Sequence, residues 1–227
     1  MTRFTRLPPG WLILLIVVLT ACGGTTRMAP LAPLGDAGAG PDCRGPFVRA
    51  RWQFVHAIRM DVAGRSSFFN GVIDVDPNGN AIRCTLLTLE GLVLFDARLA
   101  GTAAVMKAIP PFDRPALATG ILADVALIFL PPQGNLRETG RTTAGTACRF
   151  VDARGGVVEV ATARDGTWRI RKYDDAGRMT REVISGATGR KNTAGTLFIP
   201  DTFSLTAPGT HGYSLHFRLL SATPINH

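Results

Sequence analysis

Several features that would assign a function at once are missing from this chain of 227 residues. It lacks any run of about 20 apolar residues, the length that a helix needs to cross a bilayer. It has no Cys-x-x-Cys pair or Cys/His cluster of the kind that holds zinc, and neither the Gly-x-Ser-x-Gly elbow of hydrolases nor the His-Glu-x-x-His motif of metalloproteases. The four histidines are scattered: His56, His211, His216 and His227. The sequence therefore predicts no metal site, no cofactor and no catalytic centre. An enzyme is the third alternative, which a cleft of strongly shifted ionisable groups would support.

The composition is typical of a folded, strand-rich domain. Hydrophobic residues make up 46%, aromatic residues 7% and charged residues 19%, which excludes a disordered acidic chain, a collagen-like chain and a polytopic membrane protein. The formal net charge is +8, which suits nucleic acid, anionic lipid or lipopolysaccharide as a partner. The compartment decides among these partners.

The N-terminus has the parts of an export signal. Arg3 and Arg6 give it a basic start, residues 11–20 form an apolar run, and Leu-Thr-Ala-Cys follows, ending at Cys22. The run is too short to span a bilayer, so it targets the chain and does not anchor it. We expect residues 1–21 to be removed. Because an exported protein seldom meets nucleic acid, we exclude nucleic acid as a partner.

The Leu-Thr-Ala-Cys segment resembles the bacterial lipobox, in which the cysteine thiol receives a diacylglyceryl group and the signal is cut before it. This resemblance implies that Cys22 is lipidated and anchors the chain; an ordinary secretory signal with a chance cysteine is the alternative. In Gram-negative lipoproteins an Asp after the cysteine tends to retain the protein in the inner membrane. Here Gly23 and Gly24 follow, so we expect an outer-membrane anchor and a protein that faces the periplasm.

The mature chain divides into a tether and one domain. Residues 23–42 hold five Gly, three Pro and four Ala and have no hydrophobic period. Residues 22–42 are therefore expected to be the lipidated Cys and a flexible tether. Residues 43–227 contain no low-complexity break and no internal repeat, which predicts a single domain.

Hydrophobic alternation predicts about ten strands in this domain. They are expected at residues 47–62, 69–75, 81–90, 92–99, 147–152, 157–163, 167–173, 177–184, 196–206 and 213–220. Residues 76–80, Asp-Pro-Asn-Gly-Asn, favour a hairpin turn, because Pro presets φ and Gly accepts a positive φ. A calcium loop is the alternative there, but Thr85 stands where such a loop needs a bidentate Glu.

One helix is predicted between Asp113, which can cap it, and Pro131. Pro115 suits its first turn. Apolar residues cover nearly its whole circumference, so we expect a sheet on one side and a loop or ligand on the other. Asp124 stands at the margin of the apolar stripe, either as a solvated or hydrogen-bonded helix carboxylate or as a polar contact for a ligand head group.

These elements predict a mainly β (α+β) fold, a strongly curved antiparallel sheet or unclosed β-barrel wrapped around a central helix. Their order resembles the LolA/LolB lipoprotein-localisation fold. Three stretches carry the resemblance: the hairpins of residues 71–99, the Ala-Leu-Ile-Phe-Leu-Pro-Pro segment at 126–132, and residues 197–226. The chain looks closest to uncharacterised LolB-like lipoproteins. The resemblance implies a hydrophobic cavity for acyl chains and, as in LolB, acceptance of lipoproteins from a periplasmic carrier for insertion into the outer membrane.

The first functional hypothesis is an acyl-chain cavity between the sheet and the helix. Nine apolar residues are expected to line or close it: Trp52, Phe54, Ile58, Phe69, Ile73, Phe95, Leu122, Val125 and Phe129. The expected partners are the acyl chains of a lipid or a lipoprotein donor, the membrane through the N-terminal lipid, and no second subunit. The rival hypothesis is a structural or interaction lipoprotein with the same fold and a filled core.

Three cysteines remain after Cys22 is lipidated, and in an oxidising compartment they allow three single bridges. Cys84 sits in an apolar strand phase and is expected to be a small core residue. Cys43 and Cys148 flank the two halves of the predicted sheet, so this pair is the one we favour.

Two neighbouring predicted strands carry a group of basic residues: Arg169, Arg171, Lys172, Arg178 and Arg181. Such a group is either a solvated sheet face or a surface that meets anionic lipid or an acidic partner.

Overall fold

The computed structural model describes residues 26–34, 43, 45–191, 198–209 and 212–225. The predicted signal, Cys22, His211 and His227 lie outside these ranges. The described residues form one helix, α2 (Pro115–Phe129), and the strands β1 (Trp52–Val62), β2 (Arg65–Asp76), β3 (Ala81–Leu87), β4 (Val93–Ala100), β5 (Thr102–Ala108), β6 (Asn135–Thr142), β7 (Gly145–Val151), β8 (Val157–Thr162), β9 (Trp168–Tyr173), β10 (Met179–Ser185), β11 (Gly189–Lys191), β12 (Phe198–Pro200), β13 (Thr202–Ala207) and β14 (Tyr213–Pro224). In this part of the chain no helix has the length and apolarity needed to cross a membrane.

Twelve of the strands form one antiparallel sheet in the order β5-β4-β3-β2-β1-β14-β13-β10-β9-β8-β7-β6. β1 to β5 make one meander and β6 to β10 another. The C-terminal hairpin β13–β14 joins them at the centre, since β14 pairs with β1 and β13 with β10. β5 and β6 lie at opposite edges and do not pair, so the sheet is not closed. This confirms the predicted fold class.

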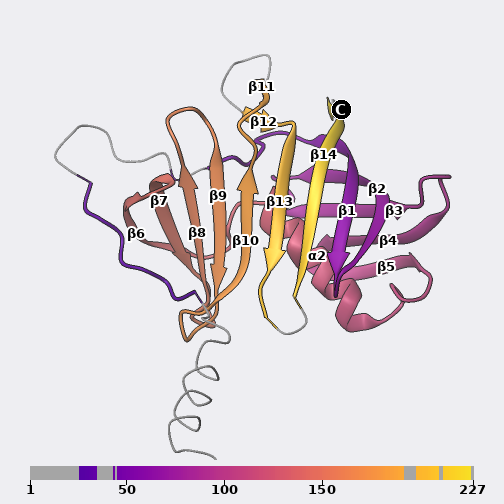
Figure 1. The fold of residues 1–227 in the computed structure, drawn as a ribbon, viewed down its shortest axis with the longest axis horizontal. Helices are drawn as coiled ribbons and strands as arrows, with labels where there is room; N and C mark the ends of the chain where they lie inside the picture. Colours follow the sequence, from indigo (N-terminus) through magenta and orange to yellow (C-terminus); the bar gives the residue numbers. More distant parts are fainter. Residues whose placement is uncertain (1–25, 35–42, 44, 192–197, 210–211, 226–227) are drawn as a thin grey trace, which may run out of the picture.

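α2 connects the two edge strands, β5 and β6, and therefore crosses the concave face of the sheet. Figure 1 shows it behind β13, β14 and β1, within the bend of the sheet. Five strand pairings contain a register shift, and such bulges bend strands and increase their twist. One shift lies between Val55 and His56 of β1, opposite β14. The irregular pairing explains how a sheet of twelve strands curves around one helix.

The two strands that flank α2 were not predicted from the sequence. β5 and β6 are edge strands, and most of their residues are exposed. An exposed edge strand needs no alternation of apolar and polar residues, so the pattern that revealed the other strands is absent from it.

The start of α2 differs from the prediction by one residue. The N-cap position is Arg114, with φ −73° and ψ 123°, and no side chain caps the helix. The assignment of Asp113 as the cap was therefore wrong. Pro115 explains the difference, because a residue before proline is held in the extended region and so becomes the boundary itself. The hairpin turn expected at residues 76–80 does connect β2 and β3, where the Gly79 amide donates a 3.0 Å hydrogen bond to Asp76 Oδ1.

Candidate functional site

The concave face of the sheet carries the residues that were predicted to bind acyl chains. The structure brings all nine into one apolar cluster, in which Phe54, Ile58, Ile73, Phe95, Leu122, Val125 and Phe129 are buried and Trp52 and Phe69 are partly buried. They come from β1, β2, β4 and α2. Strand alternation places them, because residues two apart in a strand point to the same face. Helical spacing places Leu122, Val125 and Phe129 on the side of α2 that meets the sheet.

α2 fills this concave face instead of covering an open cavity. The void between the sheet and the C-terminal end of α2 has a volume of about 40 Å³, whereas ligand sites in proteins measure roughly 300 Å³ or more. In this conformation the nine residues leave no space for an acyl chain between α2 and the sheet, and two of them, Ile58 and Phe69, also line a larger hollow described below. An acyl chain can therefore occupy this face only when α2 moves.

His56 lies at the centre of the void's aromatic wall. Its ring centroid is 5.3 to 6.1 Å from those of four phenylalanines, Phe54, Phe129, Phe203 and Phe217. Its side chain is 2% exposed, and burial lowers its pKa from 6.5 to about 4. His56 is therefore a neutral imidazole at neutral pH.

Trp168 of β9 lines the same void. The indole Nε1 of Trp168 and the imidazole Nδ1 of His56 are both buried and have no hydrogen-bond partner among the described residues. From the sequence His56 was one of four scattered histidines, and this position in the core was not predicted. The signal was available, because position 56 belongs to the apolar, inward phase of β1, between Phe54 and Ile58.

One polar cluster ties α2 to the sheet. Asp124 of α2 is 5% exposed; Arg181 Nε of β10 donates a 2.8 Å hydrogen bond to its Oδ1, and the Tyr213 hydroxyl of β14 donates to its Oδ2. The Arg181 guanidinium also lies 5.4 Å from the centroid of the Tyr213 ring, a cation–π arrangement. Burial and the hydrogen bond to Asp124 raise the pKa of Tyr213, so this hydroxyl keeps its proton. Asp124 is a hydrogen-bonded helix carboxylate, the first of the two interpretations considered for it.

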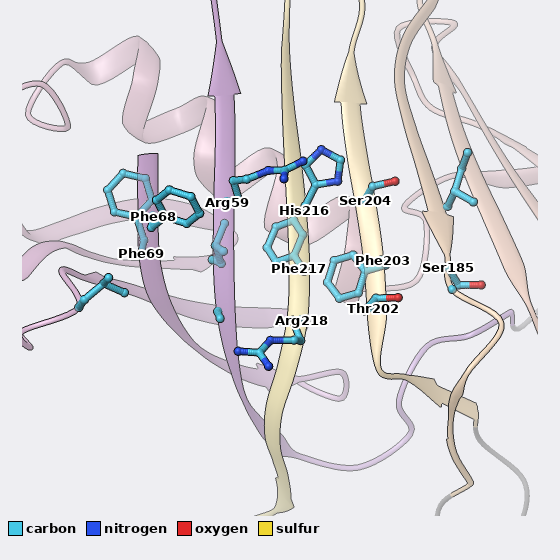
Figure 2. Close-up of a pocket in the computed structure, with 15 residues that line it drawn as sticks. Arg59, Phe68, Phe69, Ser185, Thr202, Phe203, Ser204, His216, Phe217 and Arg218 are labelled. Atoms are coloured by element: carbon cyan, nitrogen blue, oxygen red, sulfur yellow. The ribbon is translucent and has the colours of Figure 1, made fainter. Parts of the chain in front are cut away.

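A larger hollow, about 730 Å³ in volume, lies on the opposite face of the sheet. Small residues create it, since Ala57 of β1 and Thr202 and Ser204 of β13 occupy outward positions on the two strands that flank β14. Figure 2 shows Phe68, Arg59, His216 and Arg218 around it. Arg59 Nε and His216 Nε2 both approach Asp61 Oδ2, at 3.1 and 3.3 Å. This hollow was not predicted from the sequence, because small residues at outward positions have no periodic pattern.

The basic residues of β9 and β10 do not form a free cationic surface. The ion pairs are Arg169–Glu182 at 3.7 Å, Arg171–Glu182 at 2.8 Å, Arg178–Asp174 at 2.8 Å and Arg181–Asp124 at 2.8 Å. Four of the five basic side chains thus pair with carboxylates, with Glu182 shared by Arg169 and Arg171, which favours a structural role for them over a surface that binds anionic lipid.

Residues 26–34 of the predicted tether lie along the half of the sheet that β6 to β10 form. The Met28 amide donates to the carbonyl of Gly177 at 2.9 Å, and the amides and carbonyls of Ala32 and Arg141 exchange hydrogen bonds of 3.0 and 2.8 Å. This part of the tether is extended and bound to the sheet. The flexibility of the remaining tether stays a prediction.

Cys43 and Cys148 form a disulfide with Cα atoms 5.6 Å apart, the pairing that we favoured from the sequence. Cys84 is free and 1% exposed. Burial raises the pKa of its thiol to about 12, so it is an inert core residue and not a reactive thiol.

No protein-family model and no curated protein matches the sequence. Solved structures are similar to it. One is a LolA superfamily protein from Nitrosomonas europaea, with a TM-score of 0.48 and 9% identity over 82% of this chain and 90% of that chain. A second is a putative outer membrane lipoprotein-sorting protein domain from Vibrio parahaemolyticus, with a TM-score of 0.48 and 9% identity over 77% of this chain and 85% of that chain.

A third is a DUF1329 family protein from Desulfovibrio piger, with a TM-score of 0.44 and 9% identity over 77% and 85% of the two chains. At this identity the likeness concerns the course of the chain alone and does not identify a ligand.

Proposed function

We propose that this chain is an outer-membrane-anchored lipoprotein, facing the periplasm, that binds acyl chains of a lipid or a lipoprotein between α2 and the concave face of the sheet. In this proposal the structure is the closed, empty form. α2 moves away when an acyl chain binds, and binding serves transport or localisation to the outer membrane.

The observation that supports this proposal most is the way α2 is held. α2 lies on the concave face, and within the part of the chain that the structure describes it contacts the sheet through apolar side chains and through the Asp124 cluster. The hydrophobic effect has no preferred direction and scales with buried area, so an acyl chain can replace α2 as the cover of this face. The nine residues would then contact the acyl chain, for which they leave no space in the closed form.

Burial of an acyl chain contributes more free energy than the hydrogen bonds that tie α2 to the sheet. Burying a chain of about ten methylenes contributes roughly 8 kcal/mol, at about 0.8 kcal/mol for each methylene. A hydrogen bond to a charged group, such as those of the Asp124 cluster, contributes about 1.5–3 kcal/mol. Acyl-chain binding therefore exceeds the cost of releasing this cluster.

Membrane attachment rests on the lipobox. Lipidation of Cys22 supplies two or three acyl chains, and a lipid anchor with more than one chain holds a protein stably on a membrane. Gly23 and Gly24 after the cysteine support sorting to the outer membrane. The backbone hydrogen bonds between residues 26–34 and the sheet would keep the domain close to this anchor.

The second candidate is a structural or interaction lipoprotein whose core is simply filled. The small inner void of about 40 Å³ favours it. The two candidates differ in one testable respect, because only the first requires that α2 gives way to an acyl chain.

Titration with a fluorescent acyl ester separates the two. Val125 is 6% exposed and faces the sheet, so Val125→Asp places an unpaired charge where the acyl chain would lie, and binding should be lost. Thr119→Asp introduces the same carboxylate on the exposed side of α2 and should leave binding intact. Arg178→Ala, at an exposed ion pair of the β9–β10 turn, should also leave it intact.

Circular dichroism shows whether each variant folds, and Val125→Thr is the milder change if the Asp variant does not. Equal binding by the parent and by a folded Val125→Asp variant would exclude a site beneath α2. The filled-core candidate would then be the better one.

A further inference from the structure

His56 and Trp168 each bury a polar nitrogen that lacks a hydrogen-bond partner among the described residues. Their side chains are 2% and 6% exposed, and both line the void of about 40 Å³ beneath the end of α2. A single buried polar group without a partner is uncommon and destabilising. Two such groups at one void indicate a place where an external polar atom completes the site.

We propose that this void is the polar end of the acyl-chain site, where Trp168 Nε1 and His56 Nδ1 donate hydrogen bonds to the carbonyl oxygen of an ester-linked acyl chain. The inference rests on the proposed function and adds the chemical class of the ligand's polar end.

The donor chemistry matches a carbonyl oxygen. The indole Nε1 of Trp168 can only donate. A neutral imidazole carries one N–H, and in the tautomer protonated at Nδ1 the nitrogen that lacks a partner is the donor. A carbonyl oxygen has two lone pairs and accepts from both groups.

The lining of the void excludes an ionised carboxylate. The other residues around it are apolar or aromatic, and among the described residues none of them is Arg or Lys. His56 supplies no positive charge, since burial lowers its pKa to about 4. A free fatty acid would bury an unpaired charge there, which is costly, whereas an ester carbonyl is neutral.

The void also joins the apolar face without a break. Phe54 and Phe129 line the void and belong to the nine residues of the acyl-chain cluster. An ester oxygen held by His56 and Trp168 would therefore direct its chain beneath α2 towards Ile58 and Phe95. In the empty form the volume suits one water molecule, whose share of liquid volume is about 30 Å³.

The test compares three probes of equal chain length with the full chain at neutral pH: a methyl ester, the matched methyl ether and the free fatty acid. The parent should bind the ester about tenfold more tightly than the ether, which lacks the carbonyl. His56→Phe and Trp168→Phe should each lower this ratio, and the double variant should bring it close to one, while the affinity for the ether is kept. His216→Phe makes the same substitution on the outer face and should keep the parent's ratio.

The indole N–H resonance of Trp168 supplies a readout that does not depend on variants. It should shift when the ester is added to the parent and stay unshifted with the ether. Equal ester and ether affinities, or an indole resonance that the bound ester leaves unchanged, would mean that the void holds water only. That outcome overturns this inference and leaves acyl-chain binding intact, whereas failure of all three probes to bind overturns both.

Discussion

Tyr213→Phe tests whether the Asp124 cluster holds α2 closed. The Tyr213 hydroxyl donates to Asp124 Oδ2, and Arg181 donates to Oδ1 at 2.8 Å. Replacing Tyr by Phe removes the first hydrogen bond, keeps the second, and leaves the aromatic ring beneath the guanidinium. The carboxylate of Asp124 thus stays paired, and the perturbation is confined to one contact between α2 and β14.

The expected size of the effect on the closed state follows from the free energy of the lost hydrogen bond. A hydrogen bond to a charged group is worth about 1.5–3 kcal/mol, and the lower value applies because Arg181 still compensates the charge. A closed state weakened by this amount opens about tenfold more often, since 1.4 kcal/mol corresponds to a factor of ten. The association rate of a fluorescent acyl ester, measured by stopped flow, should rise about tenfold if opening precedes binding.

The chain contains two tyrosines, so Tyr173→Phe is the matched control. Tyr173 is buried in β9 and lies near Arg171 and Glu159, away from α2. Its replacement should leave the association rate at the parent's value. Equal rates for Tyr213→Phe and the parent, with both folded, would refute the idea that this cluster closes the site.

Three further predictions concern processing and stability. Cys22→Ser should abolish incorporation of a palmitate analogue in metabolic labelling and leave the precursor or a soluble periplasmic form, whereas label retained by the variant would mean that the lipobox assignment is wrong. Burial lowers the pKa of His56 from 6.5 to about 4, so between these pH values the unfolded chain binds a proton that the folded chain does not. The free energy of unfolding should fall by up to about 3 kcal/mol from pH 6.5 to 4, and denaturant titrations should show that His56→Phe removes this loss. The Cys43–Cys148 bridge spans a sequence separation of 105, for which chain entropy gives about 4–5 kcal/mol; replacing both cysteines with Ala should lower Tm, after which a reductant should have no further effect.

Most of the fold was predictable because its strands are half buried. In β1 the inward residues Phe54 and Ile58 alternate with outward ones such as Arg59, and the structure keeps this phase along the strand. The turn at residues 76–80 was predictable from its Pro and Gly. The order of strands in the sheet could not be predicted from these local patterns, because the central pairing of β14 with β1 joins the two ends of the domain.

The elements that the sequence did not reveal were missed for separate physical reasons. β6 is exposed along most of its length, so no burial constrains its residues to alternate. The start of α2 was displaced because Pro115 restricts Arg114 more strongly than a side-chain cap at Asp113 would have done.

The residues of the candidate site were predictable from the sequence, but whether they enclose an open cavity was not. Helical and strand periodicity identified which apolar residues share the concave face. Whether they enclose a space depends on packing between β1, β9 and α2, which a periodic pattern does not contain. His56 was overlooked for a related reason, because its polarity concealed that it follows the same inward phase as Phe54.

Acyl-chain binding is tested most directly by mass spectrometry of the lipids that co-purify with the full chain. An organic solvent extracts lipid held non-covalently and leaves acyl groups attached to Cys22 on the protein. Parent and Val125→Asp proteins are purified in parallel, so lipid carried over from the membrane is the same in both. We predict an acyl ester at about equimolar amount in the parent extract and its depletion in the variant extract. Equal lipid content in the two extracts, or none in either, would contradict a lipid site beneath α2.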